Sequence, residues 1–402
     1  MNLFENWGVI PIINASGTVT RLGGAPLPEA VMLAMWEAAR ESVPIEQLQA
    51  AASRRISTYT GTEAALVTSG SAAGLTLGTA ALLAGLNLAR MEQLPQVSNF
   101  PNEFIVAREQ RNGYDHAVRA AGAKLVEVGC NEVQAGAGVR RTETWEYVAA
   151  FGPQTAGVFY VSTPDAQPPL ADLVQAAHAH GLPVLVDAAG QLPPRSQLKD
   201  IPATGADLVV FSGGKGIRGP QSTGILCGRR EWIASAALQM LDMDDHWELW
   251  EPPTEFLSNK NLLPGMPRHG LGRGFKVSKE EIAALLTALD LFVSGAYLAD
   301  RPRFLQCLEI ISSQLIPHGF PCELRPGHHE ESFPLLDITI RPSHTGCTAW
   351  EVCRRLRHGS PPIYVSHGRL AQGKLVIHPL HLQTENSQQI VEQILSCVAR
   401  AD

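Results

Sequence analysis

A lysine enclosed by glycines and an aspartate that ends an apolar run are the side chains of this chain best placed for chemistry. Lys215 lies in the segment 212–216, Ser-Gly-Gly-Lys-Gly, which follows the apolar run 207–211, and Asp187 ends the apolar run 184–187. A lysine just past one strand, with an acid at the end of a neighbouring strand, is suited to hold pyridoxal phosphate. The lysine forms a Schiff base, and the acid keeps the pyridine nitrogen protonated so that the ring accepts electrons. We therefore predict that Lys215 and Asp187 are the catalytic pair of a pyridoxal-phosphate-dependent enzyme.

The glycines beside this lysine favour a cofactor site over a surface turn. Gly213, Gly214 and Gly216 leave the backbone open where a flat ring must approach, and Ser212 offers a hydroxyl group nearby. Asp187 could equally cap the turn after its strand, but ligands of open parallel sheets gather at the carboxyl ends of strands. The segment lacks the upstream glycine spacing of a nucleotide-binding P-loop, so we do not expect a nucleotide there.

A turn of small residues at 68–72, Thr-Ser-Gly-Ser-Ala, is the expected seat of the cofactor phosphate. Ser69, Gly70 and Ser71 would offer free backbone N–H groups at the start of a helix, where the helix dipole attracts anions. The same residues could form an ordinary helix cap, since serine is a favoured capping residue. Agreement with the lysine and aspartate motifs favours the phosphate seat.

The remaining candidates concern the cofactor ring and the substrate. Tyr114 or His116, before an expected helix, could cover the face of the ring, with a slight preference for the histidine. Arginine and lysine side chains could bind a substrate carboxylate or phosphate, or remain solvated charges. The residues considered for this role are Arg218, Arg273, Lys276 and Arg369.

Strand and helix signals alternate along most of the chain, which predicts a mostly parallel sheet covered on both faces. The expected strands are 64–68, 104–107, 124–128, 157–162, 184–187, 207–211 and 224–227. Expected helices include 28–39, 45–59, 115–121, 170–180 and 278–296, the last beginning at a Ser-Lys-Glu-Glu capping box. The strands 335–340, 363–366 and 374–377 and the helices 350–358 and 387–398 predict a small α+β layer near the end of the chain.

These patterns predict an α/β protein of two domains. We expect a large cofactor-binding domain at 45–270, and a small domain built from the N-terminal segment 1–44 and from 271–402. An irregular, proline-containing stretch at 242–273 would form a bridge between domains or active-site loops.

Composition and charge exclude several classes of protein. Net charge is −7 with no basic run, so nucleic acid is not an expected partner. Seven cysteines without CxxC spacing suggest reduced thiols in the cytoplasm, and no signal peptide is indicated. The most apolar stretch, 72–89, is rich in small residues that suit a packed helix better than a membrane span.

Several segments resemble those of fold-type I pyridoxal-phosphate enzymes of the selenium-transferase-like family. That family contains L-seryl-tRNA(Sec) selenium transferase and D-glucosaminate-6-phosphate ammonia-lyase. The resemblance extends from about residue 8 to residue 295, and more loosely beyond. The segments that carry it are 12–18, 67–73, 124–129, 183–189 and 207–228, the last being the most specific and closest to the lyase-like members.

The resemblance implies a homodimer or larger assembly with active sites near subunit interfaces, where Arg273 or the N-terminal segment could serve a neighbouring subunit. Three departures affect the substrate. The chain reads Arg21-Leu-Gly-Gly where the tRNA-dependent transferases carry Asn-Leu-Gly-Arg, and Ser366 follows a strand that usually ends in arginine in the lyases. The catalytic-type segment also starts almost at Met1, without the extra N-terminal domain of the transferases, which argues against a tRNA substrate.

The predicted reaction is an α,β-elimination on a small amino acid or amino-sugar acid, with Lys215 as the general base that removes the Cα proton. The alternatives are β-replacement, racemisation and transamination, which share the cofactor. A non-catalytic pyridoxal-phosphate-binding protein is the alternative from another class.

Overall fold

The computed structural model describes residues 3–130, 140–327 and 329–399, and these residues form two compact units. The large unit runs from Leu27 to Val293, and the small unit contains the residues before Leu27 and those after Val293. These boundaries differ from the expected 44/45 and 270/271. One reason is the packing of helix α10 (Lys279–Ser294), whose Leu285 side chain lies against Gly213 in the lysine loop of the large unit.

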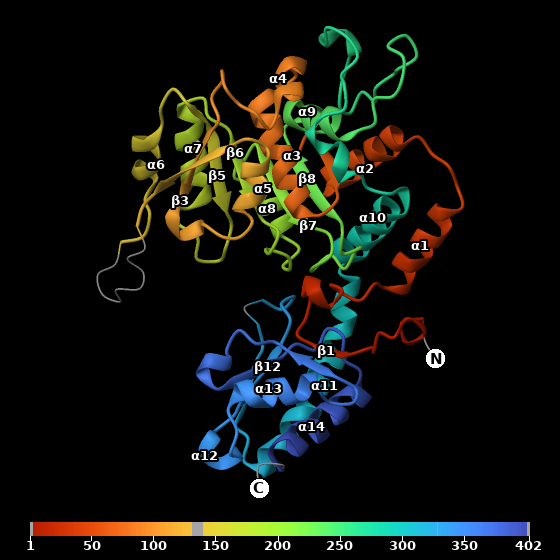
Figure 1. The fold of residues 1–402 in the computed structure, drawn as a ribbon, viewed down its shortest axis with the longest axis vertical. Helices are drawn as coiled ribbons and strands as arrows, with labels where there is room; N and C mark the ends of the chain where they lie inside the picture. The colour runs from red at the N-terminus through yellow and green to blue at the C-terminus, as the bar shows by residue number, and fades with distance from the viewer. Residues whose placement is uncertain (1–2, 131–139, 328, 400–402) are drawn as a thin grey trace. The chain divides into compact units, whose positions relative to one another are not determined.

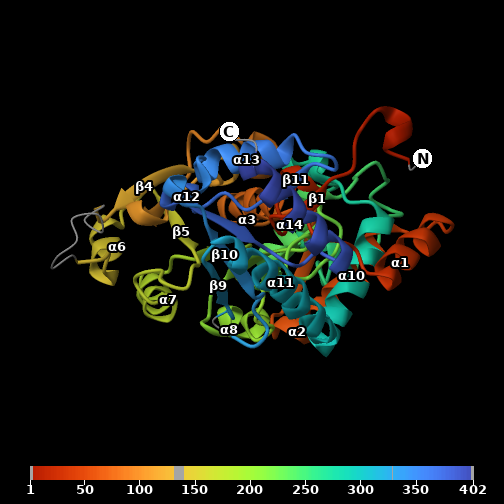
Figure 2. The same ribbon diagram turned by 90° about the horizontal axis from the view of Figure 1, so that it is seen from below.

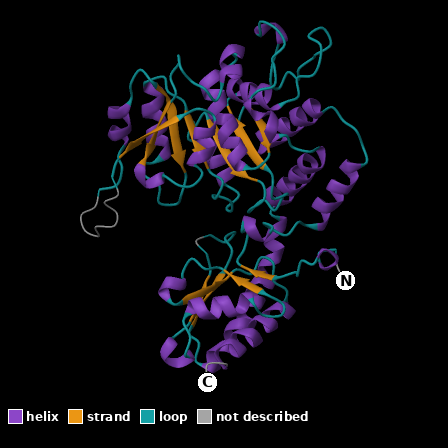
Figure 3. Cartoon of the chain, viewed as in Figure 1, coloured by secondary structure: helices purple, strands orange, loops and turns teal. Residues whose placement is uncertain are grey.

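One mixed sheet forms the centre of the large unit (Figures 1 and 3). In the described part of the chain it has seven strands in the order β2-β8-β7-β6-β5-β3-β4. Their bounds are β2 Ala64–Thr68, β8 Gly224–Gly228, β7 Leu208–Ser212, β6 Val184–Asp187, β5 Thr155–Val161, β3 Glu103–Ala107 and β4 Lys124–Val128. Strand β8 is antiparallel to both of its neighbours, and the other strands share one direction. The prediction of a mostly parallel sheet is confirmed.

Helix α3 (Ser71–Ala84) covers one face of this sheet because its glycines let it approach closely. A Cβ atom added at Gly78 would lie within 3.4 Å of the side chains of Leu185, Leu208 and Leu226. Side chains alternate along a strand, so the intervening residue Val209 points to the other face. Val209 is also fully buried, so both faces of the sheet are covered.

The other helices of the large unit surround the sheet. They are α1 Glu29–Ala39, α2 Ile45–Thr60, α4 Leu88–Gln93, α5 Asp115–Ala120, α6 Thr144–Ala150, α7 Leu170–Ala179, α8 Gln197–Ala203 and α9 Arg230–Met240. Helix α10 begins with the expected capping box: the Glu281 N–H donates to the Ser278 hydroxyl at 3.2 Å, and the Ser278 N–H donates to the Glu281 carboxylate at 3.3 Å. Helix α9 was not among the helices expected from the sequence.

The small unit is an α+β layer, as expected (Figure 2). Strand β1 (Ile13–Ala15) pairs in parallel with β11 (Ile363–Val365), which joins the N-terminal segment to the end of the chain. Strands β12 (Lys374–Ile377), β10 (Leu335–Thr339) and β9 (Cys322–Arg325) form an antiparallel sheet. The helices are α11 Arg301–Leu315, α12 Pro342–Thr345, α13 Ala349–Arg357 and α14 Thr384–Ala399. Helix α11 and strand β9 were not among the elements expected from the sequence.

Across the described residues, no helix by itself has the length and apolar composition that crossing a bilayer requires. Helix α10 and the helical segment 296–318 meet those criteria only when taken together as a bent pair.

Candidate active site

The three predicted cofactor motifs meet at one edge of the large sheet. Strands β2, β6 and β7 run in the same direction, so their last residues, Thr68, Asp187 and Ser212, lie at the same edge. Thr68 and Ser212 both pair with Gly224, the first residue of β8, which fixes the lateral spacing between the phosphate turn and the lysine loop. The sheet therefore brings together residues that are far apart in the sequence.

The phosphate turn packs directly on the amino end of β8. A Cβ atom at Gly224 would lie 2.5 Å from the carbonyl carbon of Gly70 and 2.6 Å from the amide nitrogen of Ser71. Gly70 has a φ of 91°, a value that favours glycine, and Ser71 is the first residue of α3. The Gly70 N–H already donates to the Thr68 carbonyl at 2.8 Å, whereas the N–H groups from Ser71 onward at this helix start have no helical partners of their own, so they can bind a phosphate.

The close approach at Gly224 makes a testable prediction. In Gly224→Ala, the added methyl group must displace the turn at Gly70 and Ser71, and we expect the dissociation constant for pyridoxal phosphate to rise about tenfold to a hundredfold. Titration of the cofactor-free protein, followed by visible absorbance, measures this constant. Gly152→Ala is the control, since a Cβ atom there would meet nothing within 4 Å. An unchanged constant in Gly224→Ala would contradict the assignment of the phosphate seat.

Backbone hydrogen bonds hold the lysine loop in a compact turn. The Gly213 N–H donates to the Thr223 carbonyl at 2.9 Å, the Gly219 N–H donates to the Gly213 carbonyl at 2.9 Å, and the Arg218 N–H donates to the Lys215 carbonyl at 3.1 Å. Lys215 is half-buried in this turn. The loop therefore fixes the backbone of the lysine.

Asp187 has the environment that a partner for a protonated pyridine nitrogen needs. Its side chain is buried, and the Ala189 N–H donates to Oδ1 at 3.0 Å. Burial raises the pKa of the Asp187 carboxyl group, and the Ala189 N–H and the charge of Lys215 act in the opposite direction. Among the described residues no other group donates to this carboxylate, so Oδ2 can accept the N–H of a pyridinium ring. The residues present therefore fit pyridoxal phosphate.

Tyr114 and His116 lie beside the amino-terminal half of α3. The Thr76 hydroxyl of α3 donates to the Ala117 carbonyl at 2.9 Å, which joins the start of α5 to the helix that begins at the phosphate turn. Tyr114 and His116 are both exposed, and the guanidinium of Arg119 lies 3.2 Å from Nδ1 of His116. Either ring could cover the cofactor, and the choice between them stays a prediction.

Arg218 is distinguished by its backbone. Its side chain is buried, and its backbone φ is 61°. Among the described residues, no other non-glycine residue has a positive φ. Such a conformation is strained, and strained residues concentrate at functional sites. Its position three residues after Lys215 is compatible with the predicted role in substrate binding.

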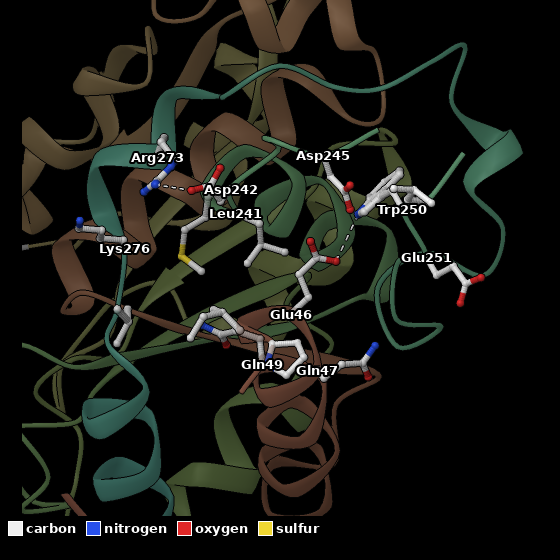
Figure 4. Close-up of a pocket in the computed structure, with 15 residues that line it drawn as sticks. Glu46, Gln47, Gln49, Leu241, Asp242, Asp245, Trp250, Glu251, Arg273 and Lys276 are labelled. Atoms are coloured by element: carbon white, nitrogen blue, oxygen red, sulfur yellow. Dashed lines mark hydrogen bonds and ion pairs between the residues drawn. The ribbon is translucent and has the colours of Figure 1, made fainter. Parts of the chain in front are cut away.

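Arg273 and Lys276 line a different pocket, of about 550 Å³, which Figure 4 shows. Neither Lys215 nor Asp187 is among the residues that line it. The Arg273 guanidinium donates to the Asp242 carboxylate at 2.6 Å, and hydrogen bonds from the Asp244 backbone and from His269, with the charge of Arg273, lower the pKa of that carboxyl group. Arg273 and Lys276 therefore belong to a pocket that does not include the lysine loop, although both lie in the large unit.

The same pocket contains two residues that the sequence analysis did not consider. The Trp250 indole donates to the Glu46 carboxylate at 3.3 Å (Figure 4). Burial raises the pKa of Glu46, the hydrogen bond from Trp250 lowers it, and the negative charge of Asp245 raises it. No local signal could have found this pair, because its members come from α2 and from the irregular stretch after α9.

Arg369 is engaged within the small unit. Its guanidinium forms an ion pair with Asp337, a fully buried residue of β10 that also accepts hydrogen bonds from Arg325 at 3.0 and 2.8 Å. A buried carboxylate needs such partners, because an unpaired buried charge is strongly destabilising. Arg369 thus has a structural partner that the sequence analysis did not anticipate.

The sheet and the site define a class of protein: a pyridoxal-phosphate-dependent enzyme with the fold-type I architecture. Residues 12–243, more than half of the chain, match the family described as SelA, L-seryl-tRNA selenium transferase. The chain belongs to this family.

Three similar proteins are informative. The chain is 28% identical to a 5'-C-glycyluridine monooxygenase-decarboxylase of a Streptomyces species, over 97% of this chain and 90% of that protein. It is 27% identical to the D-glucosaminate-6-phosphate ammonia lyase of Salmonella typhimurium, over 94% of this chain and 93% of the relative. A solved structure of D-glucosaminate-6-phosphate ammonia-lyase superposes with a TM-score of 0.81 at 26% identity, covering 100% of this chain and 99% of that chain.

These comparisons confirm the predicted family, fold class, enzyme class and cofactor. The individual site residues remain predictions, which the geometry described above makes specific enough to test.

Proposed function

We propose that this protein is a lyase that eliminates a β-substituent from an amino acid or amino-sugar acid and releases ammonia and a 2-oxo acid. The observation that carries the proposal is the placement of Lys215 and Asp187 at one edge of the sheet, beside the phosphate turn. The likeness to D-glucosaminate-6-phosphate ammonia lyase over nearly the whole chain supports this reaction and this class of substrate.

The chain's own residues would divide the work as follows. Bound pyridoxal phosphate supplies a ring that accepts electrons from the substrate Cα. The N–H groups at Ser69 and Ser71 would bind its phosphate, with Gly70 shaping the turn through its N–H bond to the Thr68 carbonyl, and the Asp187 carboxylate would keep a proton on its ring nitrogen. Ser212 would offer its hydroxyl group to the cofactor from the end of β7.

Lys215 would perform the proton transfer. Its neutral amine removes the Cα proton as a general base and becomes an ammonium group, which can return the proton to the leaving β-hydroxyl group. Loss of water followed by hydrolysis of the unsaturated product has a simple balance: one β-hydroxy amino acid gives one 2-oxo acid and one ammonia. Arg218, three residues after Lys215 in the same loop and buried, would bind the anionic part of the substrate.

A second candidate follows from the other near relative. The likeness to 5'-C-glycyluridine monooxygenase-decarboxylase covers about as much of this chain as the likeness to the ammonia lyase. An oxygen-consuming decarboxylation is therefore the second reaction to test. β-Replacement, racemisation, transamination and cofactor binding without turnover remain the alternatives that the same residues permit.

Product analysis of the purified holoenzyme tests the proposal. We expect ammonia and a 2-oxo acid in equal amounts from D-glucosaminate 6-phosphate or a related β-hydroxy amino acid, without an amino acceptor and without oxygen. Oxygen uptake with carbon dioxide release would instead establish the second candidate. A need for an amino acceptor would indicate transamination, and either result would overturn the elimination.

We further propose a homodimer or larger assembly in the cytoplasm. The large apolar side chains of Met32, Leu33 and Trp36 on α1 are each more than half exposed, which supports a partner surface. Among the described residues no disulfide joins any of the seven cysteines, which supports a reducing compartment. The acidic net charge supports a small-molecule substrate rather than tRNA, although the family description names a tRNA-linked one.

A further inference from the structure

Two arginines of the small unit share one aromatic ring. The guanidinium carbon of Arg21 lies 5.7 Å from the ring centroid of Tyr364, and that of Arg357 lies 5.2 Å from the same centroid. Arg21 also lies beside His367, with 3.5 Å between Nη2 of the arginine and Nδ1 of the histidine. These four side chains, named here the Tyr364 cluster, place two permanent positive charges and an imidazole around one tyrosine.

The fold of the small unit determines this arrangement. Tyr364 is the middle residue of β11 and pairs with Asn14 of β1, so the turn after β1 returns Arg21 to the same strand. Arg357 is the last residue of α13, which packs on β11, as Figure 2 illustrates. The cluster therefore depends on the pairing between the two ends of the chain, and all of its members belong to the small unit.

The positive charge of this cluster is uncompensated. Within the described residues, no carboxylate lies within ion-pair distance of Arg21 or Arg357. Nε of Arg357 is buried and has no hydrogen-bond partner in the same part of the chain. A buried donor without a partner is destabilising and is uncommon in folded proteins, and a bound ion is one of the groups that can satisfy it.

The pKa of the Cys353 thiol is consistent with two positive charges near one part of α13. Burial raises the pKa of Cys353 on α13, and the charges of Arg357 and then Arg21, with a hydrogen bond from Arg357, act in the opposite direction. Two guanidinium groups that influence one buried atom also repel each other. A bound anion would remove this repulsion and satisfy the unused donors.

We propose that the Tyr364 cluster is an oxyanion-binding site in which Arg21 and Arg357 bind a carboxylate or a phosphate monoester. The planar guanidinium groups supply paired N–H donors in the geometry that such oxyanions require, and the tyrosine ring holds both groups in place. Arg369, the small-unit arginine considered from the sequence, is already paired with Asp337 and is not part of this site.

Calorimetric titration of the holoenzyme with inorganic phosphate is the first test. We expect Arg21→Gln and Arg357→Gln each to weaken phosphate binding about tenfold or more, because each removes a charge-assisted contact. Arg354→Gln is the matched control: Arg354 lies on the same helix and is exposed. Arg369→Met should keep phosphate binding, although it should lower the free energy of unfolding because Asp337 loses a partner.

Two further probes distinguish the source of the oxyanion. Glucose 6-phosphate carries only a phosphate and gluconate carries only a carboxylate, so the probe whose affinity falls in both glutamine variants identifies the group that the site accepts. Arg21 is exposed on a short turn, so Arg21→Gln remains informative if Arg357→Gln folds poorly. Unchanged affinity of Arg21→Gln for phosphate and both probes, or an equal loss in Arg354→Gln, would overturn the proposal. These titrations measure binding without turnover, so their outcome is independent of whether the protein catalyses the proposed elimination.

Discussion

Lys215→Ala is expected to lower kcat by about a thousandfold or more, because it removes both the covalent anchor of the cofactor and the general base. It should also abolish the visible absorption band of lysine-bound pyridoxal phosphate. Steady-state ammonia release and the absorption spectrum measure the two effects. After borohydride reduction of the wild-type protein, peptide mapping should locate the pyridoxyl group on Lys215.

Lys199 provides the control for this result. It is an exposed lysine on α8 of the same large unit, and Lys199→Ala should keep the spectrum and the rate of the wild type. Turnover by Lys215→Ala at a wild-type rate, or a reduced adduct on Lys199, would show that the lysine loop has been assigned wrongly.

Asp187→Asn should give the second largest effect, with the cofactor still attached to Lys215. An amide cannot keep the pyridine nitrogen protonated, so kcat should fall on the order of a hundred- to a thousandfold. The amide oxygen can still accept the Ala189 N–H, so the loop and the visible absorption band of the bound cofactor should persist. Asp200→Asn, at an exposed position of α8, should leave kcat unchanged.

Asp187→Asn should lower activity but raise the stability of the cofactor-free protein. Because burial raises the pKa of Asp187 in the folded state above 3.8, the ionised carboxylate destabilises the folded protein. This contribution is absent at low pH, develops as the pH rises from 3.8 through the folded-state pKa, and is complete above it. Cofactor-free Asp187→Asn should therefore be more stable than the wild type at pH 7, with the difference disappearing below pH 3.8.

Denaturant unfolding of both cofactor-free proteins across this pH range measures the difference. A variant that is less stable than the wild type at pH 7 would mean that the carboxylate gains more from its neighbours than it loses by burial. The pairing of lower activity with higher stability is the pattern expected for a functional group held in an unfavourable environment.

The sequence by itself predicted the elements that hold the cofactor. Short continuous apolar runs predicted β2, β6 and β7 to within a residue or two, and the small residues after β2 and β7 predicted the turns at 69–71 and 212–216. These signals are local, because a buried strand and a glycine turn are encoded by adjacent residues. Parallel strands then necessarily bring their carboxyl ends to one edge, so the meeting of Lys215, Asp187 and Ser69 followed from the predicted topology.

The tertiary structure decided which charged residues are free to bind a substrate. Arg273 and Arg369 looked alike in the sequence as loop cations, but the fold pairs Arg273 with Asp242 and Arg369 with Asp337. Arg21 and Arg357 gave no local signal, because their shared neighbour Tyr364 reaches them only through the pairing of β1 with β11. The charge state and partners of a side chain depend on residues that packing brings near, and the spacing of residues along the chain does not encode those partners.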